Sequence, residues 1–367
     1  MVVLITGGAG FIGSHFVRLI LQERPAWSVI NLDRLTYSGN LENLRDVEER
    51  EGGKRYFFVH GDICDSSLVD SVFSGSHPLF REQGLTGPKE SGQPPIASVA
   101  HFAAESHVDR SIQDASAFFR TNVEGTRILL EAARRHWQPH EQSSKPGCRF
   151  LHVSTDEVYG SLGPSDLPFR EESPIRPNSP YAASKAAADL AVLAYAYTYS
   201  LPAVITRCCN NYGPYQHPEK FIPLFITNAL EDKPLPLYGD GLQVRDWIHV
   251  ADHCRALLAI LERGKVGEVY NIGATEERSN VQVAELIVRT LGKSRDLIRS
   301  VRDRSGHDRR YAVDAAKLKR VHEWRPERPF VEGMESTIRW YHEHSPWWKR
   351  LKDDHFWKYY KEAYGSI

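Results

Sequence analysis

A strand followed at once by three evenly spaced glycines opens the chain and limits its fold more than any other feature. Residues 2–5 form a short apolar run typical of a buried strand, and Gly7, Gly10 and Gly13 follow in a G-x-x-G-x-x-G spacing. A tight turn, a close approach of backbone to pyrophosphate and close helix–strand packing each favour a residue without a Cβ. Residues 14–22 then have the apolar spacing of a helix, whose amino terminus offers N–H groups to phosphate. The pattern predicts the first βα unit of a dinucleotide-binding sheet rather than a simple sharp turn.

The segments that follow predict a doubly wound parallel sheet. Residues 28–32 form a second apolar strand pattern that ends at Asp33, twenty residues after Gly13. A carboxylate at this place accepts hydrogen bonds from the adenosine ribose and repels a 2′-phosphate, which favours NAD over NADP. Arg34 would soften that preference, and a helix or turn cap is the alternative role for Asp33. Further buried-strand patterns lie at 56–63, 98–102, 150–154 and 203–207. Strands that alternate with helices in this way predict an α/β fold of the Rossmann type.

The alternation weakens from about residue 214, where short strand patterns mix with helical ones. Such a segment is typical of a smaller mixed α/β substrate lobe that closes over the carboxyl edge of the sheet. We therefore expect an NAD-binding domain over residues 1–213 with parts of 240–275 returning to it, a smaller lobe over 214–345, and an aromatic C-terminal extension over 346–367.

Two segments and the aromatic tail stand apart from this pattern. Residues 74–95 and 138–147 are polar or rich in Gly, Pro and Ser and lack apolar periodicity, so they are expected to be surface insertions. The aromatic residues from Trp340 onward are expected to form packing helices rather than a platform for stacking ligands.

Composition narrows the class of protein. Apolar content of 41% and charged content of 25% are ordinary for a soluble globular enzyme, and a net charge of −1 argues against a nucleic-acid-binding surface. Five cysteines form no metal-ligand pattern, and their odd number fits a reducing compartment. No apolar run is long enough to cross a membrane, and the first strand pattern leaves no room for a signal peptide. We expect a cytoplasmic enzyme with no metal, no membrane and no nucleic-acid partner.

The candidate catalytic groups follow one strand and open the next helix. Thr155–Glu157 follow the apolar run 150–154, at the sheet edge where open α/β folds bind ligands. Tyr181 and Lys185, four residues apart at the start of an alanine-rich segment, share one helical face. An ammonium beside a phenol stabilises the phenolate, so this pair can act as a base. Adjacent carboxyls with different protonation states suit coupled acid and base chemistry, whereas a capping Asp and a surface Glu are the alternative.

Two further features each allow two interpretations. The basic cluster Arg302–Arg310 is either a solvated face or, with Lys220 and Arg245, a grip for a diphosphate. The helical segments 121–136 and 181–200 are rich in small residues or amphipathic, so they either form a subunit interface or simply pack on the sheet.

These motifs resemble those of a known family. Thr6–Gly13 together with Tyr181-x-x-x-Lys185 resembles the extended short-chain dehydrogenase/reductase superfamily. Four further motifs look like those of the dTDP-glucose 4,6-dehydratases, namely Ala103–Ser111, Ser154–Gly160, Asn210–Pro214 and Asp303–Tyr311. The resemblance spans about residues 1–325 and departs from the family at the two insertions, in the aromatic extension, and at Cys209 and Phe221.

The resemblance implies a closed redox cycle on a nucleotide sugar. Tyr181, assisted by Lys185, would remove the proton of the 4-hydroxyl while NAD takes the C4 hydride, with Thr155 hydrogen-bonded to the 4-oxygen. The resulting ketone acidifies the C5 proton. Glu157 would then take that proton while Asp156, held protonated, donates to the departing 6-hydroxyl. Return of the hydride to C6 would give the 4-keto-6-deoxy sugar.

The resemblance also implies that the lobe over 214–345 mainly binds the sugar nucleotide, and it implies two sets of binding residues. The expected NAD site comprises Gly7, Gly10, Phe11, Ile12, Gly13, Asp33, Arg34, Leu35, Thr36, Asp62, Ile63, Phe102, Ala103, Ala104, Ser106, Thr121, Tyr181, Lys185 and Asn211. The expected site for the nucleotide-diphosphate sugar comprises Ser106, Thr155, Asn210, Lys220, Phe221, Pro236, Leu237, Tyr238, Arg245, Asn280, Asp303, Arg304 and His307.

Three alternatives stay open at this point. The base of the nucleotide is either dTDP or UDP, because the segments that recognise it are not placed by sequence. A 4-epimerase or decarboxylase of the same superfamily would share NAD and the Tyr181–Lys185 pair, but it does not need the acid and base after Thr155. A non-catalytic dinucleotide sensor could dispense with that pair altogether. A homodimer through the segments 121–136 and 181–200 is the expected assembly.

Overall fold

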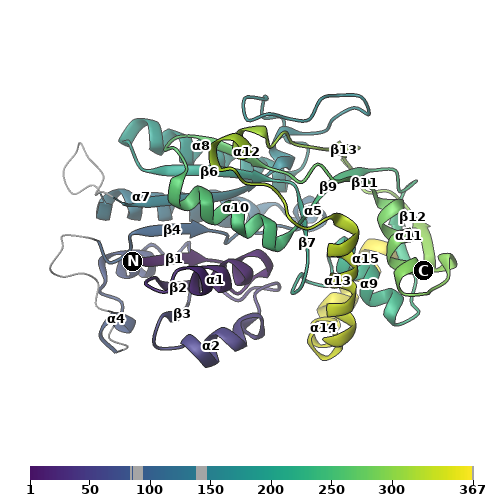
Figure 1. Ribbon diagram of the computed structural model, residues 1–367, viewed down its shortest axis with the longest axis horizontal. Helices are drawn as coiled ribbons and strands as arrows, with labels where there is room; N and C mark the ends of the chain where they lie inside the picture. Colours follow the sequence, from purple (N-terminus) through teal and green to yellow (C-terminus); the bar gives the residue numbers. More distant parts are fainter. Residues whose placement is uncertain (83–84, 86–93, 138–146, 366–367) are drawn as a thin grey trace.

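The computed structural model describes residues 1–82, 85, 94–137 and 147–365 (Figure 1). Its centre is a seven-stranded sheet in the order β10-β6-β5-β4-β1-β2-β3, and every pairing in it is parallel. The strands are β1 Val2–Thr6, β2 Ser28–Asp33, β3 Tyr56–His60, β4 Ser98–His101, β5 Arg149–Thr155, β6 Ala203–Cys208 and β10 Val269–Ile272. The chain proceeds outward from β1 in one direction and then crosses back to β4. This order confirms the predicted doubly wound α/β fold.

Helices cover both faces of the central sheet because its strands are apolar on both sides. Val3 and Ile5 belong to one buried cluster, and Val2 and Leu4 belong to the other. The first cluster includes residues of α1 Phe11–Glu23, α2 Arg45–Glu51, α10 Val250–Arg263 and α12 Ala316–His322. The second includes residues of α3 Ser66–Ser74, α7 Thr126–Trp137 and α8 Pro180–Tyr199. The sheet is thus the middle layer of a three-layer domain.

A second lobe lies at the carboxyl edge of the sheet, toward the right of Figure 1. Its strands form a four-stranded group around β9 Val244–His249, with β7 Asn210–Tyr212, β11 Glu277–Ser279 and β13 Arg310–Tyr311, and a parallel pair of β8 Leu235–Tyr238 with β12 Ile298–Val301. Its helices are α9 Phe221–Leu230, α11 Asn280–Thr290, α13 Phe330–Glu343, α14 Ser345–Leu351 and α15 Asp354–Tyr364. The chain returns from this lobe to the central sheet through α10 and β10.

The helices of the aromatic tail pack as the sequence predicts. Trp347, Trp348 and Phe356 are buried in the core of the second lobe, beside residues of α9 and α11. The indole N–H of Trp348 donates to the carbonyl of Tyr341 at 2.7 Å, so its polar atom is satisfied in the interior.

Short elements complete the described chain. They are the helices α4 Pro78–Glu82, α5 Val108–Gln113 and α6 Ser116–Phe118, the π-helical turn Phe119–Gly125, and 3₁₀ turns at Leu41–Leu44, Asp156–Tyr159 and Arg295–Leu297. The expected insertion 74–95 therefore contains a helix, because Leu79 and Phe80 find apolar partners in the second cluster. Residues 83–84 and 86–93 of that insertion, and 138–146 of the other, lie outside the described residues. Within the described ranges, no helix has the length and apolar character needed to cross a bilayer.

A buried ion pair fixes the helix that carries the candidate base. Arg207 on β6 donates through Nε to Oδ2 of Asp189 on α8 at 2.8 Å, and the two side chains are 3% and 0% exposed. Burial raises the pKa of Asp189, but His152 and Arg207 more than offset it and hold that pKa below its usual range. The carboxylate is therefore ionised and holds α8 against β6.

The substitution Asp189→Asn tests this anchor. Removing one partner of a buried pair leaves Arg207 uncompensated, so we expect a loss of about 3–5 kcal/mol in the free energy of unfolding, measured by urea denaturation. Glu49→Gln is the control, because the pair of Arg45 with Glu49 is 78% and 64% exposed. The control should change stability by less than about 0.5 kcal/mol. Equal effects of the two substitutions would contradict the anchoring role.

Candidate active site

The glycine-rich turn lies where the strand order of the sheet reverses, between β1 and β4. Gly7 adopts φ +73°, and a Cβ added there would lie 2.6 Å from the backbone nitrogen of Ala103 in the segment after β4. A Cβ on Gly13 would meet the carbonyl oxygen of Gly7. Gly10 caps the amino terminus of α1 without a side chain, so the first N–H groups of the helix stay uncovered. These features form a cradle that fits a pyrophosphate.

Asp33 holds the glycine-rich turn as well as facing the cavity beside it. Its Oδ2 accepts a hydrogen bond from the backbone N–H of Ala9 at 2.9 Å, and its Oδ1 accepts from Leu35 at 2.8 Å. Burial raises the pKa of Asp33, and the two backbone donors counteract that rise. Asp33 therefore caps the turn, which is the alternative role that the sequence allowed, and it also lines the first cavity.

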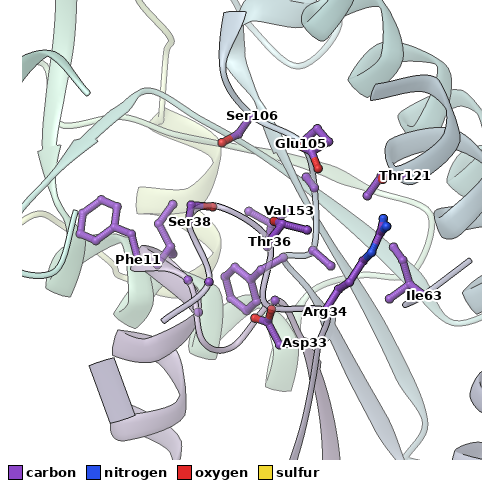
Figure 2. Close-up of a pocket in the computed structure, with 18 of the residues that line it drawn as sticks. Phe11, Asp33, Arg34, Thr36, Ser38, Ile63, Glu105, Ser106, Thr121 and Val153 are labelled. Atoms are coloured by element: carbon purple, nitrogen blue, oxygen red, sulfur yellow. The ribbon is translucent and has the colours of Figure 1, made fainter. Parts of the chain in front are cut away.

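A first cavity follows the turn along the carboxyl ends of β1, β2 and β4 (Figure 2). Figure 2 shows Phe11 at one end, Arg34 and Ile63 at the other, and Asp33 opposite Ser106 across the space. The expected NAD residues that line it are Gly7, Gly10, Phe11, Ile12, Gly13, Asp33, Arg34, Thr36, Asp62, Ile63, Phe102, Ala103, Ala104, Ser106, Thr121, Tyr181 and Lys185. Leu35 and Asn211 do not line it.

Sequence reasoning did not single out several residues of this cavity, among them Ser38, Gly39, Gly61, Val153, Gln216 and His217. Gly61 and Val153 adjoin strand ends that the sequence did predict, so their position along the chain was a usable signal. Gln216 and His217 come from the loop after β7, and no local pattern indicates that this loop returns to the cofactor side.

A second cavity adjoins the first and extends into the smaller lobe. The expected substrate residues that line it are Ser106, Thr155, Asn210, Lys220, Phe221, Pro236, Leu237, Tyr238, Arg245, Asn280, Arg304 and His307. Asp303 does not line it but accepts from Nδ1 of His307 at 2.6 Å, and Asn211 lines this cavity rather than the first. Tyr181 and Ser106 line both cavities, so the phenol stands where they meet.

Lys185 and Tyr181 lie on the same turn of α8, as their spacing predicts. Nζ of Lys185 donates to the carbonyl of Val153 at 2.8 Å, and burial lowers the pKa of Lys185 to about 8. Burial and the charge of Glu157 raise the pKa of Tyr181 well above its usual value, against the effect of a hydrogen bond with Thr155. The phenol is therefore protonated in this state, and its ionisation needs further positive charge beside it.

The two adjacent carboxyl groups occupy unequal environments. Asp156 is 2% exposed, does not line either cavity, and its Oδ2 has no hydrogen-bond partner among the described residues. Burial and the neighbouring Glu157 raise the pKa of Asp156 well above its usual value. Glu157 lines the second cavity, and burial raises its pKa while Arg304 and Arg245 oppose the rise. This arrangement favours a protonated Asp156 beside a more readily ionised Glu157.

The basic cluster divides between the cavity and the surface. Arg304 and His307 line the second cavity, whereas Arg309 pairs with Asp240 and Arg310 pairs with Glu277 outside it. Arg302 is exposed. Part of the cluster therefore faces the cavity and part lies outside it, and a grip on a diphosphate stays a prediction for Arg304 and His307.

Two further cations complete the cavity. Arg245 is buried, with its guanidinium 4.2 Å from the ring centroid of Tyr311, and Nζ of Lys220 donates to the carbonyl of Ser106 at 2.9 Å. With Arg304, three cations thus meet in one cavity, which suits a ligand that carries two phosphates.

Comparison with known proteins agrees with this geometry. The family model of GDP-mannose 4,6 dehydratase matches residues 4–79 and 93–337. A dTDP-glucose 4,6-dehydratase of Neisseria meningitidis is 47% identical over 360 residues, which is 95% of each chain. The structure of DesIV, a dTDP-glucose 4,6-dehydratase of Streptomyces venezuelae with NAD and TYD bound, has a TM-score of 0.84 at 47% identity and covers 96% of this chain and 100% of its own.

A more distant similarity concerns the epimerases. The structure of the Thermus thermophilus UDP-glucose 4-epimerase in complex with NAD is 30% identical, with a TM-score of 0.78. It covers 94% of this chain and 100% of its own. The fold and the cofactor site are therefore common to both groups, while sequence similarity is much higher to the dehydratases.

The substitution Asp33→Asn tests the link between the carboxylate and the cofactor cradle. An amide nitrogen would face one of the two backbone donors, so the turn should shift and the dissociation constant for NAD should rise roughly tenfold or more, measured by calorimetry. Asp65→Asn is the matched control, because Asp65 accepts from two backbone N–H groups in the same way but only caps α3. An unchanged NAD affinity in Asp33→Asn would contradict the role assigned to this residue.

Proposed function

This chain belongs to the dTDP-glucose 4,6-dehydratase family, and on that premise we propose that it converts dTDP-glucose to dTDP-4-keto-6-deoxyglucose with NAD as a cofactor that is regenerated in each cycle. The observation that carries the proposal is the junction of the two cavities. Thr155 and Glu157 line the second cavity beside Tyr181, which also lines the first. A sugar held by its diphosphate would present its ring to all three side chains.

Residues that line the first cavity would bind NAD, and those that line the second would bind the nucleotide sugar. When bound, NAD would supply a hydride acceptor for the oxidation at C4 and, once reduced, a hydride donor for the reduction at C6. Tyr181 would accept the proton of the 4-hydroxyl, with Thr155 hydrogen-bonded to the same oxygen. The oxidised nicotinamide and Lys185 would together supply the positive charge that the buried phenol requires.

The unequal carboxyl groups support the assignment for the elimination of water. Glu157 faces the cavity and has two arginines that favour its ionised form, so it suits removal of the C5 proton. Asp156 is buried, and its raised pKa keeps a proton available for the departing 6-hydroxyl. To reach the sugar, the proton of Asp156 would pass Thr155, whose hydroxyl lies 3.4 Å from Asp156 Oδ1.

The alternatives weighed for the sequence receive less support. A 4-epimerase does not need the acid and base, and the epimerase structure is 30% identical against 47% for DesIV. The names of these relatives specify dTDP-glucose, so they give no support to UDP-glucose as the preferred substrate. A non-catalytic sensor would have no use for Tyr181 and Lys185 at the junction.

The function is tested by incubating the purified protein separately with dTDP-glucose and UDP-glucose, without added reductant. Mass spectrometry should detect a product that has lost water from dTDP-glucose. Product from UDP-glucose alone would move the assignment to the other nucleotide. An unchanged mass with altered sugar stereochemistry would replace the dehydratase by an epimerase.

The assembly and the location are also proposals. Leu190 and Tyr197 lie seven residues apart on α8, and they are 56% and 92% exposed, so they form an uncovered apolar face. Phe119, in the turn that packs on α8, is also exposed. We propose that this face, with α7 beside it, is the homodimer interface.

The described cysteines form no disulfide, which supports a cytoplasmic location.

The double substitution Leu190→Ser with Tyr197→Ser tests the dimer. It should convert a dimer into a monomer in light scattering after gel filtration, because two large apolar side chains leave the proposed interface. Val321→Ser is a control on another helix, α12, because Val321 is also 56% exposed, and it should leave the mass unchanged. A monomeric wild-type protein would exclude this interface.

Glu157→Gln and Asp156→Asn separate the two roles in the elimination. Glu157→Gln should lower kcat by roughly 10²–10⁴ and stop exchange of the C5 proton with deuterated solvent, while NADH still forms on mixing with dTDP-glucose. Asp156→Asn should also slow the loss of water but retain the C5 exchange, because the base is intact. Loss of exchange only in Asp156→Asn would reverse the two assignments.

A further inference from the structure

Two adjacent thiols lie in the wall of the second cavity. Cys208 is the last residue of β6, and Cys209 follows it at the carboxyl edge of the sheet. Both side chains line the second cavity and neither lines the first, and the two residues are 5% and 3% exposed. Cys209 is also one of the positions at which the chain departs from the family motifs. The proposed reaction uses neither thiol, so the pair is left without a role.

The surroundings of Cys208 favour its ionised form. Nδ2 of Asn211 donates to Sγ of Cys208 at 3.3 Å. An N–H group that donates to sulfur stabilises the thiolate more than the thiol. Burial opposes ionisation, but the interaction with Cys209 and the charge of His253 more than offset it, so the pKa of Cys208 lies below its usual value. The sulfur of Cys208 is therefore a nucleophile.

His253 supplies a base in the same cavity. Its Nδ1 lies 2.8 Å from Oδ1 of Asn211, which can only accept, so Nδ1 carries the hydrogen of that bond and Nε2 is the basic nitrogen. His253 is fully buried and lines the second cavity, and its Nε2 has no hydrogen-bond partner among the described residues. The imidazole can therefore hold the proton that Cys208 releases.

Cys209 differs from its neighbour. Burial, the hydrogen bond with Cys208 and the charge of Asp246 raise the pKa of Cys209 well above its usual value. Its backbone N–H donates to the carbonyl of Ile272 at 3.0 Å, which fixes the residue at the sheet edge. One ionised and one protonated sulfur in contact form a dithiol in which the first can attack an oxidant and the second can resolve the product.

A hydroperoxide that enters the cavity would oxidise this pair in two steps. The Cys208 thiolate attacks one peroxide oxygen, the O–O bond breaks, and Cys208 becomes a sulfenic acid while the other oxygen leaves and takes the proton held by His253. The sulfur of Cys209 then attacks the sulfenic sulfur, an S–S bond forms, the S–O bond breaks, and the hydroxyl leaves as water with the thiol proton. Overall, two thiols and one hydroperoxide give one disulfide, one alcohol and one water, or two waters from hydrogen peroxide.

Closure of this disulfide would move the end of β6. Cys208 pairs with Thr155 of β5 on one side and with Ile272 of β10 on the other. A disulfide requires a specific separation and dihedral angle, which adjacent residues at the end of a strand reach only if the backbone moves. Thr155 would then be displaced from its place beside the cavity. A strained disulfide is also readily reduced, so the change would be reversible.

We propose that Cys208 and Cys209 form a reversible oxidation site for hydroperoxides, with Cys208 as the attacking thiolate and Cys209 as the resolving thiol, and that the disulfide slows turnover. The oxidation itself does not depend on the function proposed above. Only the loss of turnover rests on that function.

The test treats the purified holoenzyme with hydrogen peroxide, alkylates the remaining thiols after denaturation, and analyses tryptic peptides by mass spectrometry. Cleavage after Arg207 and Lys220 releases one peptide that contains Cys208, Cys209 and no other cysteine. In the wild-type protein this peptide should escape alkylation and be two hydrogens lighter than the dithiol form, and dithiothreitol should restore both thiols. Turnover of dTDP-glucose should fall by about tenfold or more and recover with the same reductant.

Cys209→Ser removes the resolving thiol. The peptide should then form no internal disulfide, and Cys208 should proceed to the sulfinic acid, so dithiothreitol should no longer restore turnover. Cys254→Ser is the matched control, because Cys254 is also buried but lines neither cavity. This control should form the disulfide of the wild-type protein, and each variant is compared with its own untreated sample.

The outcomes separate this proposal from the proposed function. A wild-type peptide that keeps both thiols, or inactivation of Cys209→Ser that dithiothreitol still reverses in full, overturns the oxidation site. Should Cys209→Ser fail to fold, the wild-type peptide alone decides. A disulfide that leaves the turnover of an active enzyme unchanged overturns the effect on activity. A disulfide in a protein without any dehydratase activity supports the site and overturns the proposed function only.

Discussion

The reversal of strand order between β1 and β4 is the constraint on which the rest of the structure depends. On the two sides of that point the connections between strands run in opposite directions. This leaves a crevice at the carboxyl edge of the sheet. The glycine-rich turn fills the gap only because Gly7 and Gly13 lack side chains that would meet Ala103 and the turn itself. The segments after β5 and β6 then reach the same edge, because all the strands of the sheet are parallel. One topological feature therefore brings the first cavity, the segment Thr155–Glu157, Tyr181 and the second lobe together.

Sequence could predict those parts of the site that are local in the chain. Gly7–Gly13, Thr155–Glu157 and Tyr181 with Lys185 each lie within a few residues of a predicted strand or helix boundary, so the period of the element fixes which way they face. The central sheet was predictable for the same reason, since each strand is a separate apolar run. The boundaries differed by a few residues, because hydrogen bonding rather than hydrophobicity ends an element.

The remainder depends on contacts between distant segments. Asn211 was expected beside the cofactor but lines the second cavity. Leu35 lines neither cavity, and its backbone N–H donates to Asp33. Tyr364 lines the second cavity, and Tyr359 of the same helix donates its hydroxyl to Asp109, which lies 250 positions earlier in the chain. No periodic pattern in the sequence indicates a contact between two residues so far apart in the chain. The helix at Pro78–Glu82 was missed for a related reason, since its two buried residues are too few to produce a pattern.

The helix α8 combines a buried ion pair, the candidate catalytic pair and an exposed apolar face in one element. Its first turns carry Tyr181 and Lys185, its middle is fixed to β6 by Asp189, and its outer face exposes Leu190 and Tyr197. Asp189 and Leu190 are adjacent, so the ion pair and the exposed face lie at the same level of the helix. In the proposed dimer, a partner subunit that covers Leu190 would exclude water from the exposed side of the helix and restrict its motion. The proposed dimerisation would then stiffen the support of Tyr181, the candidate base.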